Sequence, residues 1–134
     1  MKPLEVEKFV RDAFNRMQQA NTNKKKLPIH SGLIHEFDLY EEGKYVGGIT
    51  TSPWNNNSGT TNTGGRDRVK AEILYLSMFN GNENRVIILT DRKMADEIHI
   101  RFKHADFKHK ITVLCFELNN NKFTEIGQCG ICLA

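Results

Sequence analysis

The chain has 134 residues, of which 39% are hydrophobic and 26% are charged, and its net charge at pH 7 is +3. These values are typical of one globular domain over residues 1–134, and so small a charge does not by itself indicate a nucleic-acid partner. No apolar run approaches the roughly 20 residues of a membrane-spanning helix, so we expect no membrane partner. The N-terminal segment lacks the apolar core of a secretory signal, and we expect a cytoplasmic protein.

Hydrophobic periodicity predicts helices and strands in alternation along the chain. The expected elements are a helix over 3–18, a polar connector over 19–26, an edge strand over 27–30, hairpin strands over 33–40 and 44–51, a helix over 66–79, a strand over 85–90, a helix from about 91 to 102, and strands over 111–118 and 122–128. The hairpin gives antiparallel pairing, and the strand–helix–strand units give parallel pairing. We therefore predict an α/β fold with a mixed central β-sheet flanked by helices.

The register of the predicted hairpin decides which acidic side chains can meet. A three-residue loop with Gly43 in the left-handed conformation joins its two strands. This loop pairs Tyr40 with Lys44 and Glu36 with Gly48. Directly opposite residues on paired strands lie about 5 Å apart, so this register places Glu36 over Gly48.

The order of elements and the residues of the hairpin resemble the PD-(D/E)XK nuclease superfamily, which has the restriction-endonuclease-like fold. The matching frame consists of Gly32, Glu36-Phe37-Asp38 and Val46-Gly47-Gly48-Ile49-Thr50. The resemblance implies an α-β-β-β-α-β core over about residues 3–118. It also implies that Asp38 matches the first carboxylate of the family, whereas Gly48 and Thr50 stand where the second carboxylate and the lysine are expected.

In that family two carboxylates hold a divalent ion, which lowers the pKa of a bound water and stabilises charge on the scissile phosphate. The resemblance therefore implies Mg²⁺ or Mn²⁺ as a cofactor. The candidate metal ligands and catalytic residues are Asp38 and Glu36, which share one face of their strand, and Lys70 or Arg66 is the candidate replacement cation. The alternative is that both carboxylates lie on a solvated sheet face and bind nothing.

The segment 52–65 is the longest irregular stretch and the preferred ligand-contact segment. It is rich in small polar residues and leads into a helix whose N-terminus attracts anions. The candidate ligand-binding residues are Trp54, Asn62, Thr63, Arg66 and Arg68, and Trp54 offers a ring on which a base can stack. The alternative is a surface loop in which Trp54 folds back onto the core.

Two other groups of residues have alternative interpretations. The basic clusters within 24–26 and 101–110 are either solvated surface or contacts to an anionic ligand. Cys129 and Cys132 form a Cys-x-x-Cys pair without a second pair to complete a zinc site, which Cys115 and one of the five histidines could complete instead. We expect these cysteines to be apolar packing residues.

Three functions follow from the sequence. The first is a nuclease-fold protein with a degenerate catalytic motif that binds nucleic acid or another phosphate-bearing ligand. The second is an active DNA endonuclease that uses a divalent metal with Asp38 and Glu36. The third is a protein-interaction or small-ligand module on the same scaffold, because fold alone does not determine function.

Overall fold

The computed structural model describes residues 1–30 and 32–130. Within these residues the elements are α1 (Pro3–Gln18), β1 (Asn23–His30), β2 (Leu33–Glu41), β3 (Tyr45–Thr50), α2 (Thr63–Met78), β4 (Asn84–Leu89), α3 (Arg92–Phe102), β5 (Ile111–Glu117) and β6 (Lys122–Cys129). None of the helices described has the length and apolarity that crossing a membrane requires.

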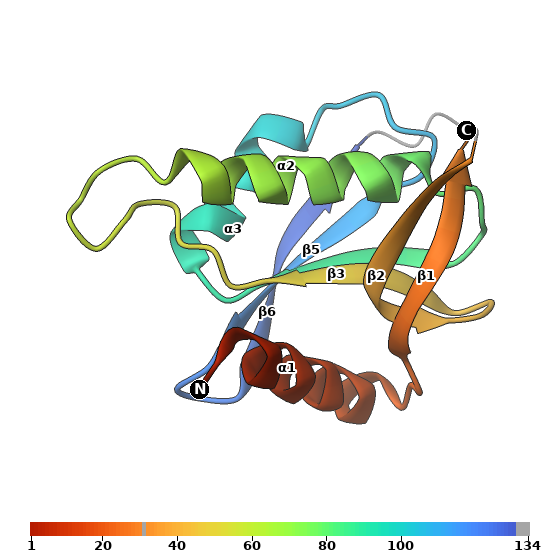
Figure 1. Ribbon diagram of the computed structural model, residues 1–134, viewed down its shortest axis with the longest axis horizontal. Helices are drawn as coiled ribbons and strands as arrows, with labels where there is room; N and C mark the ends of the chain where they lie inside the picture. The colour runs from red at the N-terminus through yellow and green to blue at the C-terminus, as the bar shows by residue number, and fades with distance from the viewer. Residues whose placement is uncertain (31, 131–134) are drawn as a thin grey trace.

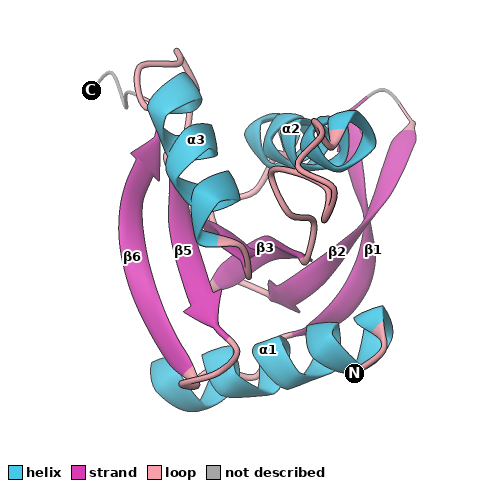
Figure 2. Ribbon diagram, turned by 90° about the vertical axis from the view of Figure 1, so that its left-hand side faces the viewer, coloured by secondary structure: helices cyan, strands magenta, loops and turns pink. Residues whose placement is uncertain are grey.

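The strands form one mixed sheet in the spatial order β1-β2-β3-β4-β5-β6 (Figure 1). The first three strands form an antiparallel meander, β4 and β5 add in parallel, and β6 returns antiparallel to β5. Helix α1 covers one face of the sheet, and α2 and α3 cover the other (Figure 2). The α/β class, with a mixed sheet flanked by helices, is confirmed.

Each face of the sheet has its own hydrophobic core. Phe37 and Ile87 belong to the core under α2 and α3, whereas Leu39 and Ile88 belong to the core against α1. The neighbouring residues of β4 therefore point to opposite faces, as in a strand that is covered on both sides. In β2, however, Phe37 and Leu39 are two residues apart and still enter different cores. The β1–β2 pairing shifts register here, with Tyr40 opposite Asn23 and Phe37 opposite Lys25, so β2 has one extra residue and the alternation of its side chains is interrupted.

Two predicted boundaries are wrong for physical reasons. Strand β1 begins at Asn23, so part of the predicted connector pairs with β2. Its lysine run suits an exposed edge strand, where charge discourages pairing with another chain. Helix α2 begins at Thr63 because the Asn62 side chain accepts a hydrogen bond from Gly65 N–H and caps the helix.

The predicted register of the β2–β3 hairpin is also wrong. Gly43 has the expected left-handed backbone, with φ of 76°. However, Tyr40 pairs with Val46 and not with Lys44, because the turn comprises residues 42–44 in place of the predicted 41–43 and the last pair is Glu41–Tyr45. The ladder ends at the pair Leu39–Gly47, and beyond it β2 and β3 separate. Glu36 accordingly pairs with Lys26 on β1.

Arg85 fixes the connection between α2 and β4. The residue is 3% exposed, and its guanidinium donates hydrogen bonds to the backbone oxygens of Leu76, Phe79, Gly81 and Glu83. The last carbonyl groups of a helix have no partner within the helix. One buried side chain therefore satisfies the end of α2 and the turn that follows it.

Replacing Arg85 should destabilise the fold. Arg85→Met leaves several buried carbonyl groups without a donor, at about 1–3 kcal/mol for each group, so we expect the free energy of unfolding to fall by about 3 kcal/mol or more. Urea denaturation followed by circular dichroism measures this change. The control Lys70→Met, on the exposed side of α2, should change stability by no more than about 0.5 kcal/mol. Equal stabilities of the two variants would contradict the role of Arg85.

Candidate functional site

Asp38 occupies the gap that opens where β2 and β3 separate. Its Oδ2 accepts a hydrogen bond from Ile49 N–H at 2.8 Å, so a side chain takes the place of a strand partner. Burial is the main cause that raises the pKa of Asp38 to about 7. The bond from Ile49 opposes this rise, whereas the negative charges of Glu7 and Glu72 add to it. The carboxyl group therefore lies where it is sensitive to the charges on both faces of the sheet.

Glu72 of α2 fills the space that a side chain on residue 48 would occupy. A Cβ atom added to Gly48 would lie 2.5 Å from Glu72 Oε1 and 2.6 Å from its Cγ. Glycine at this position therefore allows Glu72 to pack against β3. The structure thus brings a carboxylate from another element to the place where the resemblance expects the second acidic residue.

The two oxygens of Glu72 have different surroundings. Oε2 lies 2.9 Å from His35 Nε2, whereas Oε1 is buried without a hydrogen-bond partner among the described residues. His35 stacks on Tyr75, with 4.1 Å between ring centroids, and meets Phe37 edge-on. Burial lowers the pKa of His35, but its hydrogen bond to Glu72 and the neighbouring carboxylates raise it more, so the net shift is upward. The imidazole therefore orients Glu72 and offsets part of its charge.

A polar opening adjoins the Glu72 carboxylate at the end of β3. Its volume is about 260 Å³, and it is lined by Ile49, Thr50, Thr51, Ser52, Arg68 and Glu72. Arg68 is exposed and lies one turn before Glu72 on the same side of α2. Hydroxyl groups and a guanidinium thus surround a carboxylate in a space that admits a phosphate group.

Glu36 lies in a different environment from the one predicted. Lys24 Nζ is 2.8 Å from Glu7 Oε1 and 3.9 Å from Glu36 Oε1. The hydrogen bond to Glu7 is the main cause that raises the pKa of Lys24, and the charges of Glu7, Asp38 and Glu36 contribute. Glu36 therefore belongs to an ion-pair network with α1, and the register that placed it over Gly48 is not present.

The structure separates the two predicted replacement cations from the opening. Lys70 is exposed and lies about 200° around the axis of α2 from both Arg68 and Glu72, so it does not line the opening. Arg66 donates to Trp54 O and to Asn55 Oδ1, both at 2.8 Å. Arg68 is the predicted ligand-contact residue that the structure brings to the carboxylates.

Trp54 is folded onto the core, as the alternative interpretation expected. It is 8% exposed, and the guanidinium carbons of Arg66 and Arg101 lie 3.4 and 4.7 Å from its ring centroid. Asn62 is occupied as the cap of α2 and donates to Pro53 O. Thr63 is exposed at the start of α2. The segment between Trp54 and Asn62 projects from the body of the protein (Figure 1).

The other metal-binding candidates are not supported by the geometry. Among residues 1–30 and 32–130, no group of three or more His, Cys, Asp or Glu side chains is arranged to hold a metal ion. Burial raises the pKa of Cys129 to about 12, which keeps its thiol protonated, and Cys132 lies outside the described residues. Cation binding here would therefore depend on the carboxylates of Asp38 and Glu72, whose charges interact.

Comparisons of this chain with protein-family models, with curated proteins and with solved structures find no match. The interpretation of the site therefore rests on its own residues.

Sequence reasoning missed Glu72, although a signal was present. Glu72 lies at helical spacing with the buried residues Val69, Ile73 and Leu76. An acidic residue inside an apolar stripe of i, i+3, i+4 and i+7 positions indicates a carboxylate that faces the core. Burying such a carboxylate costs free energy unless it has a hydrogen-bonding or charged partner, so the sequence pattern predicts a site residue at position 72.

Asp38 should make stability depend on pH. Because its pKa in the folded state is raised, its contribution is complete below the ordinary value of 3.8 and is lost as the pH rises to about 7. Asp38→Asn removes this loss, so we expect its stability relative to the natural chain to rise by about 2–4 kcal/mol between pH 4 and pH 8. Urea denaturation in a chelating buffer measures the change. Parallel pH profiles of the two proteins would refute the assignment, and Glu36→Gln is the control.

Proposed function

We propose that the protein is a nuclease of the restriction-endonuclease-like class, which hydrolyses phosphodiester bonds of nucleic acid with a divalent cation held by Asp38 and Glu72. The observation that carries the proposal is the Glu72 carboxylate in the side-chain space of Gly48. The order of a helix, a three-stranded meander, a second helix and a further strand gives additional support.

The two carboxylates fit a divalent cation. A buried carboxylate oxygen without a donor is costly, and Glu72 Oε1 is such an atom. Asp38 is buried beside other negative charges, which raise its pKa further. Mg²⁺ is commonly bound through one or two carboxylates while keeping several waters, so two protein ligands are enough. When bound, the ion supplies positive charge and lowers the pKa of a coordinated water.

The residues of the chain have separate tasks in this proposal. The Ile49 N–H fixes the Asp38 carboxylate, and His35 fixes that of Glu72. Positioning of this kind accounts for a large share of phosphoryl-transfer catalysis. Arg68 supplies the positive charge that Thr50 lacks, since it lines the same opening. The hydroxyl groups of Thr50, Thr51 and Ser52 are donors for the phosphate oxygens.

Cleavage should depend on Glu72 and not on Glu36. We expect the purified protein to nick supercoiled plasmid in the presence of Mg²⁺ or Mn²⁺. Glu72→Gln should lower the rate by about a hundredfold or more, because it removes one of the two carboxylates that would hold the divalent ion. Glu36→Gln is the matched control and should retain the rate.

Three results would count against this assignment. They are cleavage that survives in the Glu72→Gln variant, cleavage lost equally in Glu36→Gln, and cleavage that persists in a chelator. Both variants must give the same circular dichroism spectrum as the natural chain. This control shows that a loss of activity does not result from unfolding.

Binding without cleavage is a second candidate function, which Thr50 favours because a hydroxyl cannot replace the charge of a lysine. In this case Arg68 should still contact phosphate. We expect the affinity for duplex DNA, measured by fluorescence anisotropy without divalent ions, to fall with salt. Arg68→Ala should reduce the slope of log affinity against log salt by about one. Lys70→Ala is the control from the other side of α2, and an equal effect of both substitutions would exclude a specific contact at Arg68.

A further inference from the structure

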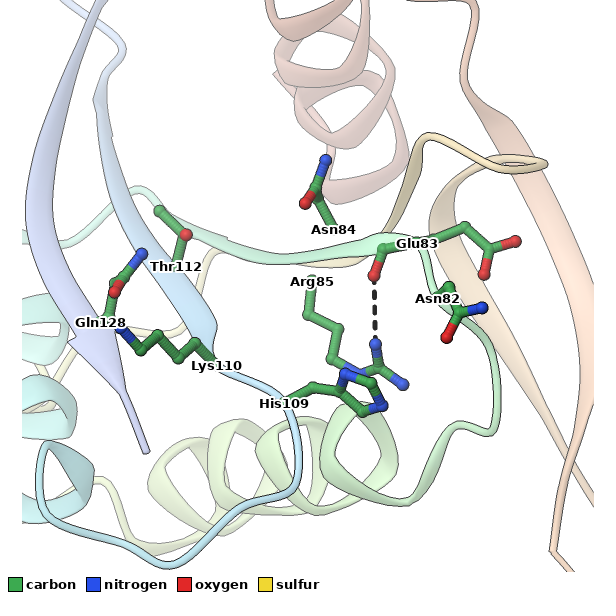
Figure 3. A pocket seen from close by; sticks show the side chains of 8 residues that line it. All are labelled: Asn82, Glu83, Asn84, Arg85, His109, Lys110, Thr112 and Gln128. Atoms are coloured by element: carbon green, nitrogen blue, oxygen red, sulfur yellow. Dashed lines mark hydrogen bonds between the residues drawn. The ribbon is translucent and has the colours of Figure 1, made fainter. Parts of the chain in front are cut away.

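A second polar pocket lies at the other end of the parallel strands. Its volume is about 360 Å³, and it is lined by Asn82, Glu83, Asn84, Arg85, His109, Lys110, Thr112 and Gln128 (Figure 3). Leu89 pairs with Thr50 at the candidate nuclease site, and Asn84 begins the same strand five residues earlier. At about 3.3 Å per residue the two places are separated by roughly 17 Å along β4.

Arg85 brings a buried positive charge to the wall of this pocket. Its hydrogen-bond partners are four backbone oxygens, which are neutral, and no carboxylate among the described residues bonds to it. The Glu83 carboxylate instead accepts hydrogen bonds from Tyr40 Oη and Gly43 N, both at 3.1 Å. Figure 3 shows this carboxylate turned away from the guanidinium. The positive charge of Arg85 therefore has no bonded counter-ion.

The opposite wall adds donors that are not otherwise used. The side chains of Lys110, Thr112 and Gln128 have no hydrogen-bond partner within the part of the chain that the structure describes. Burial lowers the pKa of His109, and the positive charges of Arg85 and Lys108 lower it further. Two cationic side chains, Arg85 and Lys110, therefore line the pocket with the one carboxylate of Glu83, and β5 and β6 add free hydrogen-bond donors.

We propose that this pocket binds the phosphate group of a small organic phosphate. A dianionic tetrahedral group matches two cationic side chains and donors that come from several directions, because each oxygen can accept a hydrogen bond. The volume lies in the range of pockets for small molecules and exceeds what a single free ion would fill. Lys110, Thr112 and Gln128 offer direct contacts to the phosphate. The guanidinium of Arg85, which is 3% exposed and donates to four backbone oxygens, adds positive potential. The site is independent of the proposed nuclease function and needs no divalent cation.

Nuclear magnetic resonance of the full chain tests this proposal. Inorganic phosphate and a nucleoside 5′-monophosphate are titrated separately in a chelating buffer of constant ionic strength. We expect saturable shifts of the backbone amides of Lys110, Thr112 and Gln128, and a rise in the pKa of His109 as an anion offsets the charges around it. If the nucleoside monophosphate binds more tightly than inorganic phosphate, the ligand is a phosphate ester. If the two affinities are equal, the phosphate group alone is recognised.

Substitutions separate a built site from general attraction to a basic surface. Lys110→Glu should weaken binding by about tenfold or more, since it replaces an attractive contact with a repulsive one. Lys108→Glu is the matched control, because this exposed lysine lies on the same segment and does not line the pocket. Both variants keep Arg85 and with it the end of α2.

Four results would overturn the proposal. They are shifts that do not saturate, shifts centred on Arg68, equal losses in the Lys110→Glu and Lys108→Glu variants, and loss of phosphate binding in Glu72→Gln. The last comparison also distinguishes the two proposals, because failure of plasmid cleavage leaves phosphate binding at this pocket unchanged.

Discussion

The hydrogen bond between the Asp38 carboxylate and Ile49 N–H determines the shape of the site. The β2–β3 ladder stops at Leu39–Gly47, so Ile49 has no backbone acceptor on β2. A buried N–H group without a partner is costly, and the Asp38 side chain supplies the acceptor. Ile49 N–H therefore keeps a hydrogen bond although β2 and β3 separate. On its other side β3 continues its parallel ladder with β4. Proteins tolerate such local departures from regular pairing mainly where function requires them.

The separation of the strands also explains why a helix provides the second carboxylate. Beyond Leu39 the side chains of β2 are not opposite those of β3, and Glu36 is directed to the network of Lys24 and Glu7. The space above Gly48 is then open to α2, where Glu72 fills it. Because the two carboxylates come from different elements, their spacing depends on helix-on-sheet packing and not on a strand motif.

The sequence predicted the elements well because their periodicity is strong, as in the two-sided strand β4 and the amphipathic α1. It did not predict the β2–β3 register, because that depends on where the three-residue turn begins, and Gly43 lies within the turn in both registers. Trp54 illustrates another limit. Its burial depends on Arg66 and Arg101, which are distant in sequence and meet only in the folded chain. Glu72 is an intermediate case. Its position in an apolar stripe could be read from the sequence, but its contact with Gly48 could not, because that contact depends on how α2 packs on the sheet.

The two polar sites have opposite electrostatic character, although β4 runs from one toward the other. At the end of β3, Asp38 and Glu72 repel a phosphate, so a cation held between them should strengthen phosphate binding there. At the start of β4, Arg85 and Lys110 attract phosphate directly. The two sites lie roughly 17 Å apart along β4, about two Debye lengths in physiological salt, so their exposed charges, such as those of Arg68 and Lys110, interact weakly. Dependence on a divalent cation is therefore the property that distinguishes a phosphate bound at one end of the strand from a phosphate bound at the other.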